Sequence, residues 1–314
     1  MALDHYVSQV HLRNFYSPVL GNKMHAIRKR DLLKFPCGSK DVCRIDDGST
    51  NAYLTEERII EEFLKGVEPR YNEAVSCLRR GEIDETTIYV IAGFAAYVAT
   101  CSPAAMRVHS APMRQVVEAT SKILDAKGMF GPSPTGLGSR SFTELLESKA
   151  IQVNVDQKYP QAIGISNILK TASVFGNGLW DIIVNDHASH SPFFTSDFPV
   201  AVEHAEDPRV LNRIVPLTAE LALRIIPQPE TRGEVDLSFS KMRFRVVRPN
   251  HSEVCSLNQT IIRSAEELVF FRDDLPWIPD FVRKHARFRV QAHTEEIRTG
   301  DGYFVISSMQ LREA

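Results

Sequence analysis

The opening segment DHYVSQVHLRNF, residues 4–15, places polar side chains capable of chemistry among apolar ones at helical spacing. If Ser8 is the N-cap of a short helix, Gln9 and Leu12 fall along one side of that helix. His5 then lies just before the positive helix end, where an anion is stabilised. Because imidazole changes charge near neutral pH, His5 is a candidate general acid or base. The alternative is that His5 is an ordinary surface or capping residue.

Two carboxylates, Glu61 and Glu68, form the second candidate group. On a single helix they lie on the same shoulder of the apolar stripe, two turns apart, which is about 10 Å of rise. Direct chelation of one small cation by both is therefore awkward unless other ligands lie between them. They are predicted to hold a divalent cation such as Mg²⁺ or Mn²⁺ together with a third carboxylate, or else to form a solvated acidic helix edge.

The third carboxylate is Asp197, in the stretch FFTSDFPV. Two aromatic residues indicate a buried strand, and Pro199 ends strand pairing just beyond the aspartate. An aspartate at the end of a buried strand is a candidate for a cleft, where Asp197 would be a catalytic or metal-binding group. The alternative is a turn in which the carboxylate only shapes the exit from the strand.

Other polar stretches are weaker candidates. NDHASH carries Asp186, His187 and His190, the right types for a transition metal, but no fourth ligand lies nearby in the sequence. KMRFRVVR predicts a strand with basic side chains on one face and Phe244 buried on the other, and RKHARFR adds four more basic residues. The two stretches could form a basic wall for phosphates or ordinary solvated faces. Their basic residues are Lys241, Arg243, Arg245, Arg283, Lys284, Arg287 and Arg289.

The composition limits the classes of function. A net charge of −2 over 314 residues lacks the overall basic surface of a protein that binds duplex nucleic acid broadly. The five cysteines are odd in number and show no C-x-x-C spacing, which predicts a reducing compartment. Neither a secretory signal nor a stretch long enough to cross a bilayer is present, so the chain is expected to be cytoplasmic, with no membrane partner. The marker motifs of P-loop proteins, serine hydrolases and zincins are missing as well.

Several helices must position these residues. The periodicity from Thr55 to Arg80 predicts one long amphipathic helix that carries both glutamates. A second helix is predicted from Asp84 to Cys101, and a third runs from Ser102-Pro103 to about Lys127. Residues 1–127 are thus expected to be mostly helical, with one strand at KMHAIRKR.

The rest of the chain changes character after residue 127. GMFGPSPTGLGSR, within residues 128–141, predicts a flexible loop rich in Gly, Pro and Ser. Helical patterns over 142–174 then give way to short β-like stretches, from LWDIIV to YFVISS. We expect an α+β fold, with a helical N-terminal half packed on a largely antiparallel sheet from residues 142–314, in a single unit of residues 1–314.

The order of five stretches resembles one known family. H-Y-V-S-Q-x-x-L-R-N-F, IEEFLKGVEPRY, PFFTSDFPV, VPLTAELAL and SLNQTII are similar to a bacterial and archaeal family catalogued as domain of unknown function 4238, over roughly residues 4 to 270. The resemblance implies no activity, but it implies which positions belong together. These are His5, Gln9, Arg13, Asn14, Glu61, Glu68, Ser196, Asp197 and Asn258.

The chain departs from the family pattern at two positions. Ser8 replaces a proline, which is benign because serine caps a helix as well as proline starts one. Cys101 stands where the family often has an arginine two positions before Pro103, so an anion-binding role there would pass to Arg107.

Together these features favour a hydrolase that acts on a phosphodiester or a nucleotide, with metal assistance as an option. Asp197 with Glu61 or Glu68 would hold the cation, and His5 would move the proton. Substrate would be oriented by a larger polar set, namely Gln9, Arg13, Asn14, Ser196, Asn258 and Arg107. One alternative is a non-catalytic sensor or partner-binding protein with a buried polar network. Another is a hydrolase or transferase acting at a nucleotide N-glycosidic bond.

Overall fold

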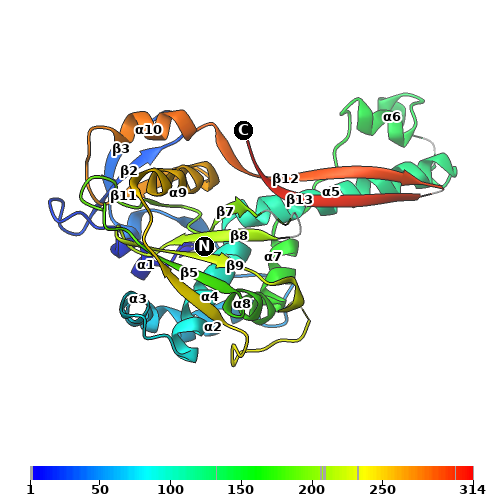
Figure 1. Cartoon of the computed structure of the whole chain (residues 1–314). Helices are drawn as coiled ribbons and strands as arrows, with labels where there is room; N and C mark the ends of the chain where they lie inside the picture. The colour runs from blue at the N-terminus through cyan, green and yellow to red at the C-terminus, as the bar shows by residue number, and fades with distance from the viewer. Residues whose placement is uncertain are drawn as a thin grey trace.

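The computed structural model describes residues 3–131, 133–205, 207, 210–231, 233–300 and 302–313. One position of the predicted 128–141 loop, residue 132, lies outside the described residues. The fold is α+β, as the sequence predicts, with most helices in the N-terminal half and most strands in the C-terminal half (Figure 1).

Helices dominate the first 176 residues. The α-helices are α1 Gln9–Arg13, α2 Ile59–Val67, α3 Tyr71–Arg80, α4 Glu85–Cys101, α5 Pro103–Ala126, α6 Phe142–Glu147, α7 Lys158–Ser166, α8 Ile168–Gly176, α9 His251–Ser264 and α10 Ile278–His285. Short 3₁₀ turns are η1 Ser39–Asp41, η2 Glu68–Arg70, η3 Thr135–Leu137 and η4 Pro229–Thr231.

The strands form two larger sheets and two ribbons. Their bounds are β1 Leu3–His5, β2 Met24–Arg28, β3 Lys34–Cys37, β4 Arg44–Asp46, β5 Leu179–Val184, β6 Thr195–Ser196, β7 Ala201–His204, β8 Leu211–Pro216, β9 Leu221–Ile226, β10 Arg243–Val247, β11 Leu268–Phe271, β12 Phe288–Thr299 and β13 Gly302–Glu313. The orders are β10-β5-β9-β8-β7 and β3-β2-β11-β6, and the ribbons are β1-β4 and β12-β13. Every pairing is antiparallel except β10 with β5.

The second sheet joins the two ends of the chain. β2 and β3 come from the first 40 residues, whereas β6 and β11 come from beyond residue 190. The strand predicted at KMHAIRKR is confirmed as β2, but the residues of its partner β11 lie 240 to 246 positions further along the chain. The four-stranded sheet therefore brings the N-terminal segment onto the C-terminal half.

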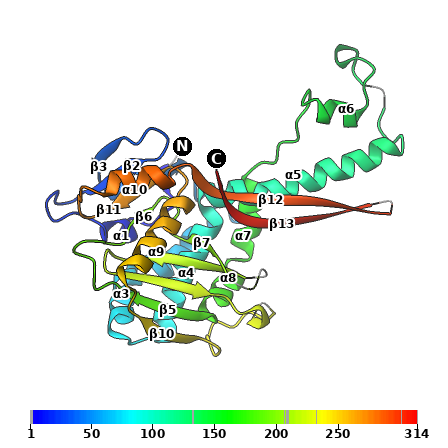
Figure 2. The ribbon, with the colours of Figure 1, turned by 45° about the horizontal axis from the view of Figure 1, so that its top comes forward.

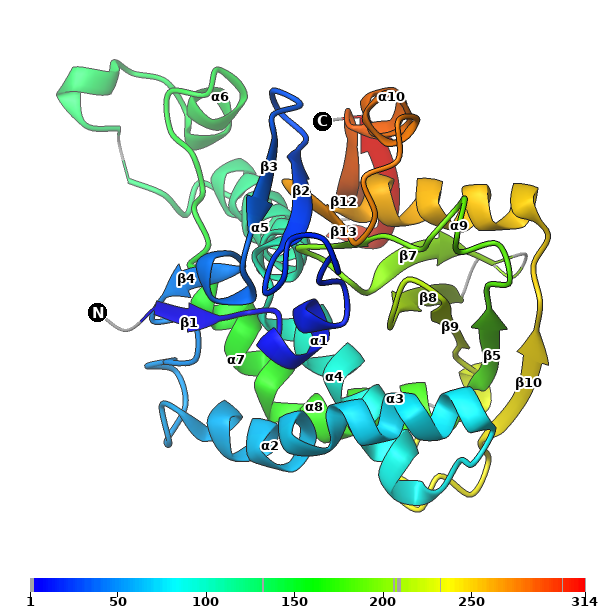
Figure 3. The ribbon, with the colours of Figure 1, turned by 90° about the vertical axis from the view of Figure 1, so that its left-hand side faces the viewer.

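Helix α4 is the centre of the main core (Figure 3). The predicted helix over 84–101 is confirmed, and Asp84 caps it by accepting a hydrogen bond from the Thr87 N–H. Most of its side chains are buried because α3, α8 and the five-stranded sheet surround it. Gly93 allows α2 to come close, since a Cβ there would lie only 3.0 Å from Val67 Cγ2.

The prediction of one long helix from Thr55 to Arg80 is wrong in detail. The chain forms α2, then η2, then α3, with the break at Pro69. Proline has no N–H to donate and its ring crowds the preceding turn, which breaks the helix at Pro69, although α5 continues through Pro112. Glu68 therefore lies at a junction between two helices and not on a straight helix face with Glu61.

Part of the molecule extends away from the body as an arm (Figures 1 and 2). It consists of α5, α6 and the long β12-β13 ribbon, and β12 packs along α5. Among the described residues no single helix has the length and apolar character to cross a membrane. α4 and α5 would meet the length and composition test only as a pair, and they are bent by 57° at their junction.

Candidate functional site

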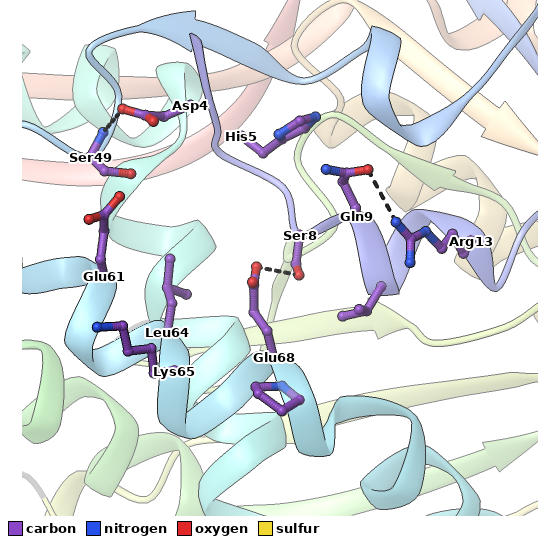
Figure 4. A pocket seen from close by; sticks show the side chains of 12 residues that line it. Asp4, His5, Ser8, Gln9, Arg13, Ser49, Glu61, Leu64, Lys65 and Glu68 are labelled. Atoms are coloured by element: carbon purple, nitrogen blue, oxygen red, sulfur yellow. Dashed lines mark hydrogen bonds between the residues drawn. The ribbon is translucent and has the colours of Figure 1, made fainter. Parts of the chain in front are cut away.

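A cavity of about 580 Å³ lies between the opening segment and α2-η2, and we call it the N-terminal cavity (Figure 4). Its walls come from β1, the start of α1, α2 and η2, and the turn after β4. The lining residues are Asp4, His5, Ser8, Gln9, Val10, Arg13, Ser49, Glu61, Leu64, Lys65, Glu68 and Pro69. The structure thus brings five of the predicted site residues together, namely His5, Gln9, Arg13, Glu61 and Glu68.

Backbone and side-chain hydrogen bonds hold the opening segment at one side of the N-terminal cavity. β1 pairs with β4, with His5 opposite Arg44, and the Tyr97 hydroxyl of α4 donates a 2.6 Å hydrogen bond to the backbone carbonyl of His5. On the other side of α1, Leu12 and Phe15 are fully buried. Burial of these two large side chains fixes α1 and leaves its polar face toward the cavity.

Ser8 occupies the N-cap position of α1 but does not cap the helix with its side chain. Its hydroxyl instead donates a 2.5 Å hydrogen bond to Oε1 of Glu68 (Figure 4). The break at Pro69 places Glu68 there, since η2 turns the chain toward α1. The contact therefore joins two segments that are 60 residues apart.

His5 is the group in this cavity best suited to move a proton. Burial lowers the pKa of His5 below its ordinary 6.5, and the nearby charge of Arg44 lowers it further. Backbone carbonyls of Ser39 and Lys40 and the carboxylate of Glu68 act in the opposite direction but do not offset burial. Its Nε2 atom is buried and has no partner at hydrogen-bonding geometry among the described residues.

The acidic side of the cavity is partly neutralised. Arg58 donates a short hydrogen bond to Glu61 and a second one, of 3.2 Å, to Asp4. The bond from Arg58 lowers the pKa of Glu61. Asp4 also accepts a hydrogen bond from the Ser49 N–H at 3.0 Å. Sequence reasoning missed Asp4, Ser49 and Lys65 as lining residues, although Asp4 directly precedes His5.

Asp197 does not lie with these residues, which corrects the expectation of a shared cleft. Its carboxylate is buried and accepts hydrogen bonds of 2.7–2.9 Å from the N–H groups of Glu266, Glu267 and Leu268. Burial raises the pKa of Asp197 to about 6, although those donors and Lys29 oppose the rise. The carboxylate joins the exit of β6 to the start of β11, about 70 residues along the chain, so its contacts are with backbone as in the turn alternative but are long-range and not local.

Ser196 and Asn258 are also tied to backbone. The Ser196 hydroxyl accepts from the N–H of Phe198. The Asn258 amide accepts from the N–H of Phe194 at 3.0 Å and donates to the carbonyl of Pro192 at 2.9 Å. Both side chains are fully buried, so neither can orient a substrate in the N-terminal cavity.

Two other predicted residues also lie outside the lining of this cavity. Asn14 ends α1, where its backbone N–H bonds the carbonyls of His11 and Leu12. Arg107 lies on α5 and donates to both carboxylate oxygens of Glu266 and to the carbonyl of Val290. Arg107 therefore does not supply to the N-terminal cavity the anion-binding group that an arginine at position 101 was expected to provide.

The predicted metal centre needed Asp197 as its third carboxylate, and Asp197 does not line the N-terminal cavity. Within the described part of the chain, no group of three or more His, Cys, Asp or Glu side chains is arranged to hold a metal ion. The same finding covers the NDHASH loop, where Asp186 pairs with Arg248 at 2.7 Å instead. We therefore assign no cation to Glu61 and Glu68.

The basic stretches do not form one wall. Arg243 and Arg245 alternate with Phe244 along β10 as predicted, but Phe244 is 44% exposed and not buried. β10 is an edge strand, and its residues 243–246 are exposed on both faces. Arg245 pairs with the buried Asp181 at 2.6 Å. Arg289 belongs to β12, in a different sheet, so the two stretches are separate.

Sequence reasoning also missed the role of His11. Its ring is fully buried beside Phe94, and its two nitrogens lie 2.8 Å from the Tyr71 hydroxyl and 2.8 Å from Thr195 Oγ1. Burial lowers the pKa of His11 to about 3, so the ring is neutral in the folded protein. His11 therefore links α1 to α3 and β6 as a structural group.

Comparison with known proteins gives one match. The family model described as "Protein of unknown function (DUF4238)" matches residues 4–274, which is most of the chain. No curated protein and no solved structure matches it.

Proposed function

The chain belongs to the DUF4238 family, and we propose that it is a hydrolase acting on a nucleotide or a phosphodiester in the N-terminal cavity. The observation that carries the proposal is His5, which lines that cavity and whose Nε2 has no hydrogen-bond partner among the residues that the structure describes. A buried polar atom without a partner is costly, and it marks the place where a bound molecule would supply one. The size of the cavity, about 580 Å³, suits a mononucleotide.

The lining offers the parts that metal-independent hydrolysis needs. The neutral imidazole of His5 takes a proton from water as that water attacks phosphorus, and the bond from phosphorus to the leaving oxygen breaks. The leaving oxygen takes a proton from solvent water, and the imidazolium returns its proton to solvent, which restores neutral His5. Glu68 favours the protonated form of His5 and so stabilises the imidazolium that forms. Arg13 and Lys65 supply positive charge for the phosphate, and the Gln9 amide lies beside His5 (Figure 4).

Hydrolysis of an N-glycosidic bond is the second candidate. It is favoured by the charge of the lining, where three carboxylates, Asp4, Glu61 and Glu68, face two cationic side chains. Carboxylates stabilise the positive charge that develops on a sugar ring when this bond breaks. Of the three, Glu68 is engaged by the neutral hydroxyl of Ser8, while the other two are paired with Arg58.

The test is an assay of the purified protein against bis(4-nitrophenyl) phosphate, dinucleotides and nucleoside monophosphates, with chromatography of the products. Phosphodiester cleavage gives a phosphomonoester, whereas N-glycosidic cleavage releases the free base. Loss of the activity in His5→Gln but not in His187→Gln, the same change at an exposed loop histidine, supports the site. A nucleotide that raises the melting temperature without turnover would instead support the non-catalytic sensor. Activity retained in His5→Gln overturns the assignment.

A further inference from the structure

Figure 2 shows where α5 and β12 leave the body to form the arm. A second cavity, of about 330 Å³, is lined by residues of these two elements. We call it the arginine cavity after Arg107, Arg114 and Arg289, which reach it from α5 and β12. The segment 153–157, ahead of α7, forms the remaining wall. It shares no lining residue with the N-terminal cavity.

The charge of this cavity is one-sided. Its described lining contains three arginines and no aspartate or glutamate, and its other polar side chains are the neutral Ser110, Asn154, Gln157 and Gln291. The carboxylates found near the arginines are Glu266 and, at 3.8 Å from Arg114, Glu118. The lining side chains carry three positive charges and no negative one, which favours an anionic ligand. Asp156 of the wall segment bonds instead to the Tyr53 hydroxyl at 3.0 Å and to the N–H of Lys158 at 2.9 Å.

Glu266 holds two of the arginines in place. It accepts hydrogen bonds from Nε and Nη2 of Arg107 at 2.8 Å and 2.6 Å, and it lies 4.0 Å from Nη1 of Arg289. Arg107 also donates from Nη2 to the carbonyl of Val290. These bonds use one edge of the Arg107 guanidinium, and Nη1 forms no hydrogen bond with the residues that the structure describes. Because the side chain is already held, it loses little further conformational entropy on binding a ligand.

Arg289 supplies an independent observation. Its Nε is buried and has no hydrogen-bond partner among the described residues. Its side chain as a whole is 40% exposed, so the guanidinium can reach both the protein and a ligand in the cavity. A buried charged donor without an acceptor is unfavourable, and an anion in the cavity would relieve it.

We propose that the arginine cavity binds a phosphoryl group carried by a small molecule. Guanidinium groups match the oxygens of phosphate in pairs, and amide side chains can donate to the remaining oxygens. Arg289 and Gln291 lie beyond the residues that the family model matches, whereas Arg107 and Arg114 lie within them. The complete site is therefore built only where β12 packs on α5, and it is independent of the hydrolase proposed above.

Isothermal titration calorimetry with sodium pyrophosphate tests the proposal on the full chain. We expect a site in the wild type whose affinity is at least about tenfold weaker in Arg114→Gln and in Arg289→Gln. Arg283→Gln on α10 is the matched control, since that arginine is 63% exposed and pairs with Asp280 outside the cavity. His5→Gln separates the two cavities and should bind pyrophosphate as the wild type does.

Two results would overturn the site: no heat of binding in the wild type, or equal affinity in Arg114→Gln, Arg289→Gln and Arg283→Gln. The first would mean that the excess charge does not select a phosphoryl group, and the second that binding is diffuse. Arg114 is 54% exposed and pairs with Glu118 only at 3.8 Å, so its variant should fold, and a melting curve checks this.

Discussion

The hydroxyl of Ser8 and Oε1 of Glu68 lie 2.5 Å apart, and this hydrogen bond joins the start of α1 to the break between α2 and α3. Ser8 is almost fully buried and Glu68 is half-buried, so the bond is partly shielded from bulk water. It fixes the distance across the N-terminal cavity at one point, with His5 on one side and Glu61 on the other (Figure 4). The first predictions concern this bond and the histidine beside it.

A double-mutant cycle measures the Ser8 to Glu68 bond. Ser8→Ala should lower the free energy of unfolding by about 1.5–3 kcal/mol, because it removes a hydrogen bond to a charged acceptor. Glu68→Ala removes the acceptor and should cost a comparable amount. Urea unfolding of both single variants and the double variant should give a coupling energy of about 0.5 kcal/mol or more. Fully additive effects would show that the bond does not form in solution.

His5 should set the acid side of the pH dependence of hydrolysis. Because burial lowers the pKa of His5, its neutral form predominates at pH 6.5 and above, and the rate should fall only below that value. The measurement is kcat/KM against pH in the wild type and in His5→Gln. The variant should lack this acid limb. A limb centred above pH 6.5 in the wild type would contradict the role.

Asp197→Asn should destabilise the protein without affecting the N-terminal cavity. The carboxylate accepts three backbone N–H bonds, and the amide nitrogen of Asn would face one of those donors. We expect a loss of about 1–3 kcal/mol in urea unfolding, with unchanged ligand response. Asp186→Asn, at an exposed aspartate, is the control and should change stability by less than about 0.5 kcal/mol. A stable variant that lost activity would restore the catalytic interpretation of Asp197.

His11 should make stability depend on pH. Its pKa is about 3 in the folded protein, below the ordinary 6.5, so the unfolded chain binds more protons between these values. Stability should therefore be fully present above pH 6.5 and fall as the pH drops toward 3, by up to roughly 1.4 kcal/mol per pH unit from this residue. Urea unfolding at several pH values checks this, and His11→Gln should show a shallower slope. A titration of the His11 ring chemical shifts centred near pH 6.5, measured by NMR, would contradict the lowered pKa.

Local patterns were enough to locate several elements of this fold. The N-cap at Asp84 and the apolar run after it predicted α4, and Ser102-Pro103 predicted the start of α5. These signals are local because capping and helical periodicity involve residues within a few positions of each other. The break at Pro69 was equally local, and the apolar stripe that continues through it concealed it.

The cavity that the opening segment shares with Glu61 and Glu68 was expected from a family resemblance, and not from spacing. Spacing alone placed the two glutamates on one helix face about 10 Å apart. The structure instead turns the chain at η2, and that turn brings Glu68 to Ser8. A hydrogen bond between segments 60 residues apart leaves no periodic signal in the sequence.

Asp197 shows most clearly what only the tertiary structure decided. An aspartate at the end of a buried strand has the same sequence pattern whether it faces a cleft or accepts backbone N–H groups. The choice depends on β11, which begins about 70 residues later and pairs with β6, so that three N–H groups point at the carboxylate. The sequence by itself determined the α+β class and the polar character of the opening segment, because both follow from local residue types. Long-range strand pairing decided which polar residues face a cavity and which satisfy the backbone, because a buried N–H group must be paired wherever its partner lies in the chain.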